Sequence, residues 1–351
     1  MKISMNIQQA IRVAIAATLA VVVLNEFNVG HGFWVLLTVV VVMQSTLGAS
    51  VHRARLRLAG TVLGVFFGAL FCALLPDHDG VFYIFAIVML FAGVYSFPIS
   101  YAWFMFFLTA LVIAIFSYHA PNPWGFATLR LIDTLIGLAI ALLVSFVVWP
   151  LPAARLHHQA LFESLQACEL YFSTIVGLYF SEQYDREVLE LHQEQLESQL
   201  QKNQQYYDEL RYEPSALFDQ RYISGSILRS EEKLQGMLLS MRVTAYRSAV
   251  SSLDVATQEK FKQLAGEISR IFKALVDAVN QDSSLPKRDD LRVATQQLKS
   301  AIATWESSQD KMIYTSNEGM NILLFLTGLR QVSGELRYIH MAVKQLRALK
   351  N

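Results

Sequence analysis

The 351-residue sequence has few cysteines and lacks the short motifs of the common enzyme classes. Its two cysteines, Cys72 and Cys168, have no neighbouring partner in the chain, so no disulfide framework is indicated. The patterns G-x-x-x-x-G-K-[ST], H-E-x-x-H, C-x-x-C and G-x-S-x-G are all missing. The adjacent pair His157-His158 does not have metal-ligand spacing. We therefore expect no catalytic residue, no metal site and no cofactor.

Charge is scarce in the first 150 residues. They hold six of the 29 Lys and Arg residues and four of the 29 Asp and Glu residues. The formal net charge of the chain is zero, so nothing in the composition indicates binding of nucleic acid. The chain divides into an apolar part and a polar part.

The apolar part contains six hydrophobic runs, which predict six membrane-spanning helices within a transmembrane domain of residues 1–152. The first run is interpreted as a membrane helix because no small-x-small cleavage site follows Leu24. The runs cover approximately residues 10–24, 33–43, 58–75, 81–97, 99–116 and 126–149.

The basic residues of the apolar part are concentrated on one predicted side of the membrane. Lysine and arginine occur before or at the start of the first span, between the second and third spans and after the sixth span, which six spans place on the same side of the membrane. They are Lys2, Arg12, Arg53, Arg55, Arg57 and Arg155. The opposite loops contain Glu26, His31, Asp77, His78, Asp79 and residues 119–124, without lysine or arginine. The positive-inside rule then predicts that both termini are cytoplasmic.

One segment of the apolar part occurs twice. Residues 57–64 and 130–137 share the pattern R-L-x-x-T-[VL]-[LI]-G, 73 positions apart. Small residues recur every four positions after each arginine, on one face of a helix. They are Gly60, Gly64, Gly68, Gly137, Ala141 and Ser145. The two copies would cross the membrane in opposite directions, which predicts two inverted three-helix repeats. The other four runs show no evident repeat.

Residues 153–351 predict a cytoplasmic α-helical bundle. Amphipathic helices are expected near 153–181, 184–212, 216–250, 255–281, 287–312 and 317–349, with no strand alternation. The whole chain is therefore predicted to be all-α. The last of these helices carries the broadest apolar stripe. It is expected to form the bundle core or a docking face on the membrane half or on a second subunit.

Several residues together resemble the fusaric acid resistance family, whose members include exporters of aromatic acids. They are Trp34, Gln44 with Gly48 and Ser50, the R-x-x-G-T-x-x-G block from Arg57 to Gly64, and Trp149-Pro150. The layout also resembles the plant aluminium-activated malate transporters. Because family members often carry two six-helix units and this chain has one, the resemblance implies a homodimer or a unit that works with another chain. A periplasmic adaptor protein is a further candidate partner.

Three charged residues are candidates for a substrate or ion pathway. Arg57 and Arg130 would attract a carboxylate from opposite sides of the membrane, or would anchor their helices by reaching the interface. Asp133 lies three positions after Arg130 on the same helix face. It is either a proton-coupling carboxylate or the partner of Arg130 in a static salt bridge.

The remaining candidates have an equally plain structural interpretation. Arg12 is either a cytoplasmic anchor or a pathway residue. Gln44 is expected to hydrogen-bond between helices, and Trp34 would stack on an aromatic acid or belong to the interfacial aromatic belt. The glycines Gly60, Gly64 and Gly68 would form a dimer contact, the pathway lining or, as we favour, a contact between the third and sixth helices.

Three functions remain open. The chain is predicted to be an inner-membrane transporter that uses the proton gradient to export aromatic or other small organic acids. The alternatives are a passive anion channel with the same helices and a membrane-anchored helical scaffold without transport activity. Since the sequence has no nucleotide-binding motif, uphill transport would depend on an ion gradient or on a partner.

Overall fold

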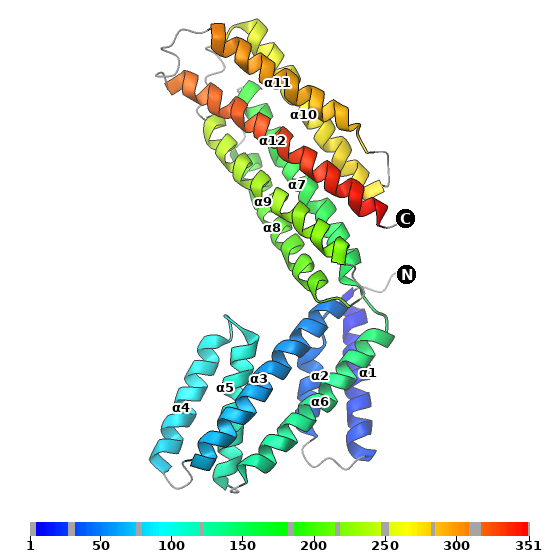
Figure 1. Cartoon of the computed structure of the whole chain (residues 1–351), viewed down its shortest axis with the longest axis vertical. Coiled ribbons are helices and arrows are strands. Elements are labelled where there is room, and N and C mark those ends of the chain that lie inside the picture. The colour runs from blue at the N-terminus through cyan, green and yellow to red at the C-terminus, as the bar shows by residue number, and fades with distance from the viewer. Residues whose placement is uncertain are drawn as a thin grey trace. The chain divides into compact units, whose positions relative to one another are not determined.

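The computed structural model describes residues 5–26, 32–74, 79–119, 122–181, 186–214, 218–246, 253–281, 285–308 and 317–349. Every regular element in these ranges is an α-helix, which confirms the all-α class. The predicted loop residues His31, Asp77 and His78 lie outside them. The helices are α1 (Met5–Glu26), α2 (Phe33–Val42), α3 (Leu47–Leu74), α4 (Asp79–Ser96), α5 (Tyr101–His119), α6 (Pro123–Val147), α7 (Ala153–Ser181), α8 (Arg186–Arg211), α9 (Phe218–Tyr246), α10 (Val255–Gln281), α11 (Arg288–Ser308) and α12 (Asn317–Ala348) (Figure 1).

The chain folds as two compact units. Unit 1 comprises residues 1–153 and 211–214, and unit 2 comprises residues 154–210 and 215–351. Unit 1 contains the apolar helices α1 to α6, and unit 2 contains α7 to α12.

Four of the described helices are long and apolar enough to cross a membrane: Asn6–Glu26, Leu47–Leu74, Tyr101–Tyr118 and Pro123–Val147. The two other helices of unit 1 are apolar but shorter, at Phe33–Val42 and Gly80–Ser96. Large apolar side chains point outward, as Ile84, Ile87 and Phe91 of α4 do. Such a surface suits hydrocarbon, because the backbone polar groups are satisfied within each helix.

The third helix is longer than the sequence suggested. The apolar run that predicts this helix begins at residue 58, but α3 is continuous from Leu47. No proline interrupts this stretch, and alanine, leucine and arginine favour helix. Arg57 is therefore not at the start of its helix. It lies ten residues after Leu47, about 15 Å along the axis.

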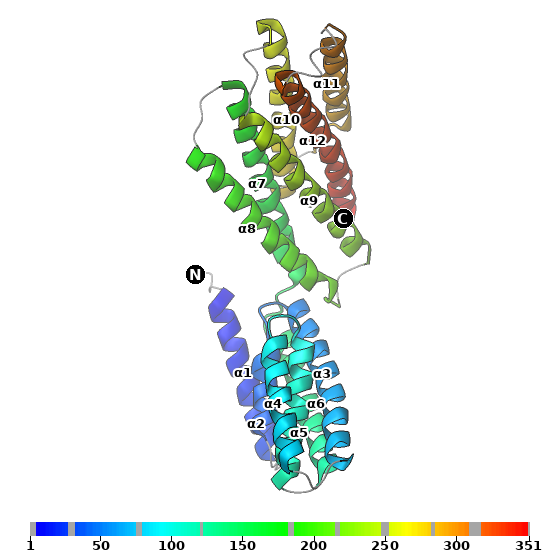
Figure 2. The ribbon, with the colours of Figure 1, turned by 90° about the vertical axis from the view of Figure 1, so that its left-hand side faces the viewer.

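Glycines allow two pairs of helices in unit 1 to pack closely. A Cβ atom added at Gly64 would lie 2.5 Å from the Phe106 carbonyl oxygen and 2.9 Å from the Thr109 Cβ on α5. One added at Gly137 would lie 2.6 Å from the Thr38 Cβ on α2. The glycine face of α3 thus packs against α5, whereas the sequence led us to expect α6. Helices α3 and α6 also touch, and Figure 2 shows the helices of unit 1 side by side.

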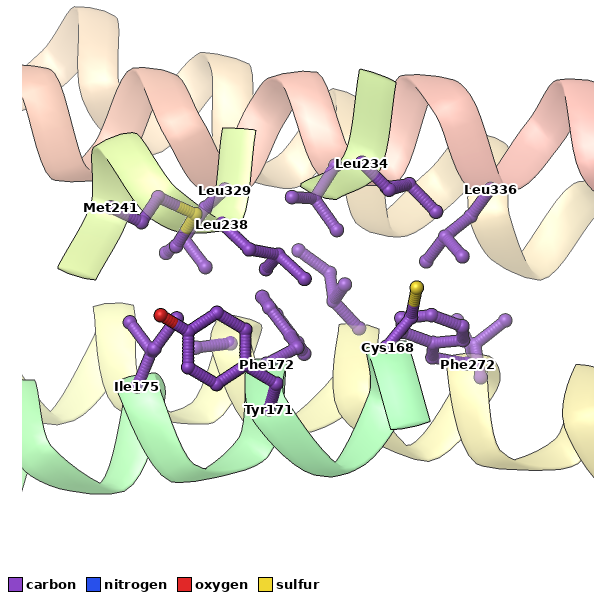
Figure 3. Packing of buried hydrophobic residues seen from close by; sticks show 14 of the residues in the cluster. Cys168, Tyr171, Phe172, Ile175, Leu234, Leu238, Met241, Phe272, Leu329 and Leu336 are labelled. Atoms are coloured by element: carbon purple, nitrogen blue, oxygen red, sulfur yellow. The ribbon is translucent and has the colours of Figure 1, made fainter. Parts of the chain in front are cut away.

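A single large apolar cluster holds unit 2 together. Side chains of α7 and α10 meet those of α9 and α12 (Figure 3). Examples are Phe172 of α7, Phe272 of α10, Leu238 of α9 and Leu329 of α12, all with no exposed surface. The apolar stripe of α12 therefore lies in the interior of this bundle.

Candidate functional site

Arg57 is buried in unit 1 among neutral partners. Its side chain is 1% exposed. One terminal nitrogen, Nη1, donates to the Tyr101 hydroxyl at 2.9 Å and lies 3.7 Å from the Met105 sulfur. The other, Nη2, donates to the Thr38 hydroxyl at 3.0 Å. Within the described residues no carboxylate lies within ion-pair distance of Arg57. Hydroxyls compensate a buried cation only in part, so this position favours an anion.

Tyr101 contacts a second arginine as well. The guanidinium of Arg53, one turn before Arg57 on α3, lies 4.2 Å from the centroid of the Tyr101 ring. A cation over an aromatic face is attracted by the ring quadrupole. Tyr101 is thus held between Arg53 at its face and Arg57 at its hydroxyl.

Arg130 has a different environment from the one expected. It is 3% exposed, and its guanidinium lies 3.9 Å from the centroid of the Trp34 ring. None of its three guanidinium nitrogens donates a hydrogen bond within the described residues. The guanidinium thus lies against an aromatic ring of α2.

A small cavity lies beside Arg130. It has a volume of about 20 Å³ and is lined by Trp34, Val112, Ile113, Phe116, Phe126, Leu129, Arg130 and Asp133. This space suffices for about one water molecule, and an organic acid does not fit without movement. Asp133 is 1% exposed. Trp34, Arg130 and Asp133 are therefore brought together at one place.

Arg57 and Arg130 interact electrostatically. The charge of Arg130 interacts unfavourably with that of Arg57 and favourably with that of Asp133. Two guanidiniums thus share this part of unit 1 with a single described carboxylate. A bound anion would relieve the repulsion between them.

Arg12 and Gln44 lie apart from this group. Arg12 is fully buried, and it donates to the backbone oxygens of Ser45 at 3.0 Å and Ser145 at 3.4 Å. The Ser145 carbonyl belongs to the last turn of α6, where a cation is favoured, and the Ser45 carbonyl belongs to the connection between α2 and α3. The Gln44 side chain donates to the Val41 and Met43 oxygens, at 3.1 and 3.3 Å. Both residues stabilise helix ends.

The other small residues of the repeat serve packing. Gly68 faces Ala110 of α5, where an added Cβ would lie 2.9 Å from the carbonyl oxygen. Gly60 faces Ala102 of the same helix. Ala141 and Ser145 of α6 have no exposed surface. These positions hold the helices that carry the two arginines.

The structure reveals a second repeat, which links α2 with α5. Gly64 faces Phe106 and Thr109, and its counterpart Gly137 faces Val35 and Thr38. Phe106 and Thr109 of α5 follow Val35 and Thr38 of α2, respectively, by 71 positions. The sequences agree at this offset, since residues 33–41 and 104–112 share F-x-x-x-L-T-x-x-V.

The α2/α5 repeat also includes residues that contact the two arginines. At the same offset Trp34 corresponds to Met105, and each lies against the arginine of its half. We call Arg57, Thr38, Tyr101 and Met105 the α3 half-site, and Arg130, Thr109 and Trp34 the α6 half-site. Sequence reasoning missed Tyr101 and Thr38, although the α2/α5 repeat is a signal that indicates Thr38 and Thr109.

Unit 2 contains a buried polar network that the sequence did not suggest. Glu231 has no exposed surface. Its two oxygens lie 2.6 Å from the Ser164 hydroxyl and 2.6 Å from the Asn203 amide nitrogen. The Asn203 oxygen lies 2.9 Å from Nδ1 of His157. Because the amide nitrogen donates to Glu231, the amide oxygen accepts, and His157 carries its proton on Nδ1.

Burial sets the protonation of this network. It raises the pKa of Glu231 to about 8, although the hydrogen bonds from Ser164 and Asn203 act to lower this pKa. Burial also lowers the pKa of His157 to about 4. Both side chains are thus predominantly neutral at pH 7. A neutral Glu231 donates its proton to Ser164, whose own hydroxyl can then donate to the Leu161 oxygen at 3.0 Å.

Unit 1 therefore has the features of an integral membrane protein with a pair of buried arginines. Comparison with known proteins gives a family match for part of the chain. Residues 15–144 match the model of the fusaric acid resistance protein-like family. This match confirms the resemblance over these residues.

Similar proteins occur in several bacteria. The chain is 30% identical over 146 residues to the inner membrane protein YccS of Escherichia coli K12, which covers 41% of this chain and 20% of that protein. It is 32% identical over 160 residues to an uncharacterized protein of Haemophilus influenzae, covering 44% and 22%. A protein of Neisseria gonorrhoeae, ORF2, is 29% identical over 144 residues, covering 41% and 34%. The chain thus spans between 20% and 34% of the length of these three relatives.

Proposed function

We propose that this protein is a bacterial inner-membrane transporter that exports aromatic or other small organic acids and is driven by the proton gradient. The observation that carries the proposal is the pair of buried arginines on repeated helices, Arg57 and Arg130, which interact with each other and with one described carboxylate. An intramembrane ionisable group is costly and marks a substrate or ion path.

In this proposal the arginines bind the carboxylate of the substrate and Asp133 couples the movement to protons. Trp34 and Phe126, which line the cavity with Arg130, provide flat apolar surfaces for an aromatic ring.

The proposed topology keeps six spans and cytoplasmic termini, with residues 1–152 as the membrane domain and residues 153–351 as a cytoplasmic helical domain. Six helices precede Trp149, an even number. The short helices α2 and α4 would cross with the help of flanking polar residues. Protons, a small organic anion and membrane lipid are the proposed partners, together with a second copy of the chain and a periplasmic adaptor protein.

Flux into proteoliposomes tests the proposal. Purified protein would be supplied with aromatic acids, aliphatic carboxylates and chloride, with and without an imposed pH gradient. We expect gradient-dependent accumulation of an aromatic acid, abolished by Asp133→Asn and strongly reduced by Arg57→Gln or Arg130→Gln. Arg55→Gln is the matched control, because Arg55 lies on α3 but is exposed.

Two results would contradict the proposal. Flux that runs only downhill and is unchanged by Asp133→Asn would indicate a passive anion channel. Absence of flux for every anion, with correctly inserted protein, would favour the scaffold function or a requirement for a partner.

A further inference from the structure

The two half-sites contain equivalent residues but are bonded differently. In the α3 half-site, Arg57 donates to the Thr38 hydroxyl at 3.0 Å. The repeats make Arg130 the counterpart of Arg57 and Thr109 the counterpart of Thr38. In the α6 half-site, however, the guanidinium nitrogens of Arg130 make no hydrogen bond within the described residues, and neither does the Thr109 hydroxyl.

This difference does not come from exposure. Arg130 is 3% exposed and Thr109 has no exposed surface. A buried donor or acceptor without a partner loses its hydration and gains nothing in return. Arg130 lies on α6 and Thr109 on α5, and these two helices pack against each other in unit 1. The repeat makes the two groups equivalent to the bonded pair Arg57 and Thr38, so the composition of the half-site does not explain the missing bond.

The surroundings of the two threonines agree with this view. Thr38 packs on Gly137 of α6, and Thr109 packs on Gly64 of α3, the equivalent glycine. Each threonine therefore lies at the closest approach of two helices. A small sliding of α5 against α6 would be enough to change the Arg130–Thr109 separation, as sliding of α2 against α3 would change that of Arg57 and Thr38.

We propose that Thr38 and Thr109 are positioning residues that close the two half-sites in alternation. The described state has the α3 half-site closed by the Arg57–Thr38 bond and the α6 half-site open. In the alternative state Arg130 donates to Thr109, and Arg57 is released from Thr38. Inverted repeats that exchange conformations give such a pair of states. The inference rests on the proposed transport function for its purpose, but the exchange itself can be measured without any substrate.

Two valines offer matched reporters of the exchange. Val112 lines the cavity beside Arg130 and is half-buried. Its counterpart at the 71-residue offset is Val41 of α2, also half-buried. Valine and cysteine are similar in size, so Val112→Cys and Val41→Cys disturb packing little. Each would be made with Cys72→Ala and placed in lipid nanodiscs. The rate of labelling by a water-soluble maleimide would then be measured.

We expect Thr38→Val to move the two reporters in opposite directions. Loss of the bond that closes the α3 half-site should raise labelling at position 41 and lower it at position 112. The ratio of the labelling rate at position 41 to that at position 112 should rise about tenfold, the factor for about 1.4 kcal/mol, which is near the lower end for a hydrogen bond to a charged group. Thr109→Val should not lower labelling at position 112, because its hydroxyl makes no bond in the described state.

Two controls make the result decisive. Thr38→Ser keeps the hydroxyl and should label like the unsubstituted reporter. Protein with Cys72→Ala alone gives the background from Cys168, which has no exposed surface. The inference is overturned if Thr38→Val changes both reporters in the same direction, changes neither, or behaves like Thr109→Val. Since no substrate is added, failure of the proposed transport function would not alter this outcome.

Discussion

The buried network of unit 2 predicts an unusual dependence of stability on pH. Glu231 has a pKa of about 8 in the folded protein, above its ordinary 4.5. The folded state then binds the proton more tightly than the unfolded state. The resulting stabilisation is complete below pH 4.5 and is lost as the pH rises to about 8.

His157 acts in the opposite direction. Its pKa is lowered from 6.5 to about 4, so its neutral form contributes stability that is present above pH 6.5 and lost as the pH falls towards 4. Between pH 4.5 and 6.5 the two slopes cancel. Between pH 6.5 and 8 only Glu231 of these two groups titrates, and about 1.4 kcal/mol per pH unit gives a loss of about 2 kcal/mol from this group.

Hydrogen exchange of the full chain in nanodiscs would measure this effect. The protection of α9 (Phe218–Tyr246), corrected for the intrinsic exchange rate at each pH, should be constant from pH 4.5 to 6.5 and then decline. Glu231→Gln should abolish the decline, because its amide can donate to Ser164 and accept from Asn203 without titrating. Glu232→Gln, on the exposed side of the same helix, should leave it unchanged.

The reasoning would be refuted by either of two results. Protection of α9 that rises between pH 6.5 and 8 would show that Glu231 is ionised in the folded protein. An equal decline in the Glu231→Gln variant would show that another group titrates.

The remaining predictions concern packing and helix ends. Gly64→Leu should abolish folding of unit 1 or displace α5, because an added Cβ already meets the Phe106 carbonyl oxygen at 2.5 Å, and size-exclusion chromatography with circular dichroism would report it. Tyr171→Phe should be neutral or slightly stabilising, since the buried Tyr171 hydroxyl makes no hydrogen bond within the described residues, whereas Ile175→Ala at the same interface should cost about 2–5 kcal/mol in chemical denaturation. Arg12→Met should lower the melting temperature more than Arg55→Met, because it removes the hydrogen bonds to the Ser45 carbonyl in the α2–α3 connection and to the Ser145 carbonyl in the last turn of α6.

The order of the helices follows from local patterns in the sequence. Apolar runs, proline breaks and amphipathic stripes are short-range signals, and they gave α7, α10 and α12 with boundaries within a residue or two of those observed. The α3/α6 repeat was equally visible, because arginine, threonine and glycine are conspicuous in an apolar segment. The α2/α5 repeat escaped notice because its matching residues are mostly apolar and only Thr38 and Thr109 distinguish it.

The sequence by itself determined that the chain is helical, that its first part is apolar and that Arg57 and Arg130 are related. Only the tertiary structure decided what those arginines contact. Spacing on one helix indicated that Asp133 is near Arg130, whereas only the structure shows that the guanidinium lies over Trp34 of α2. Glu231, Asn203 and His157 come from three helices, and nothing local indicates that they meet. Contacts between helices depend on how side chains fill the space between them, and a pattern along one helix carries no record of its neighbours.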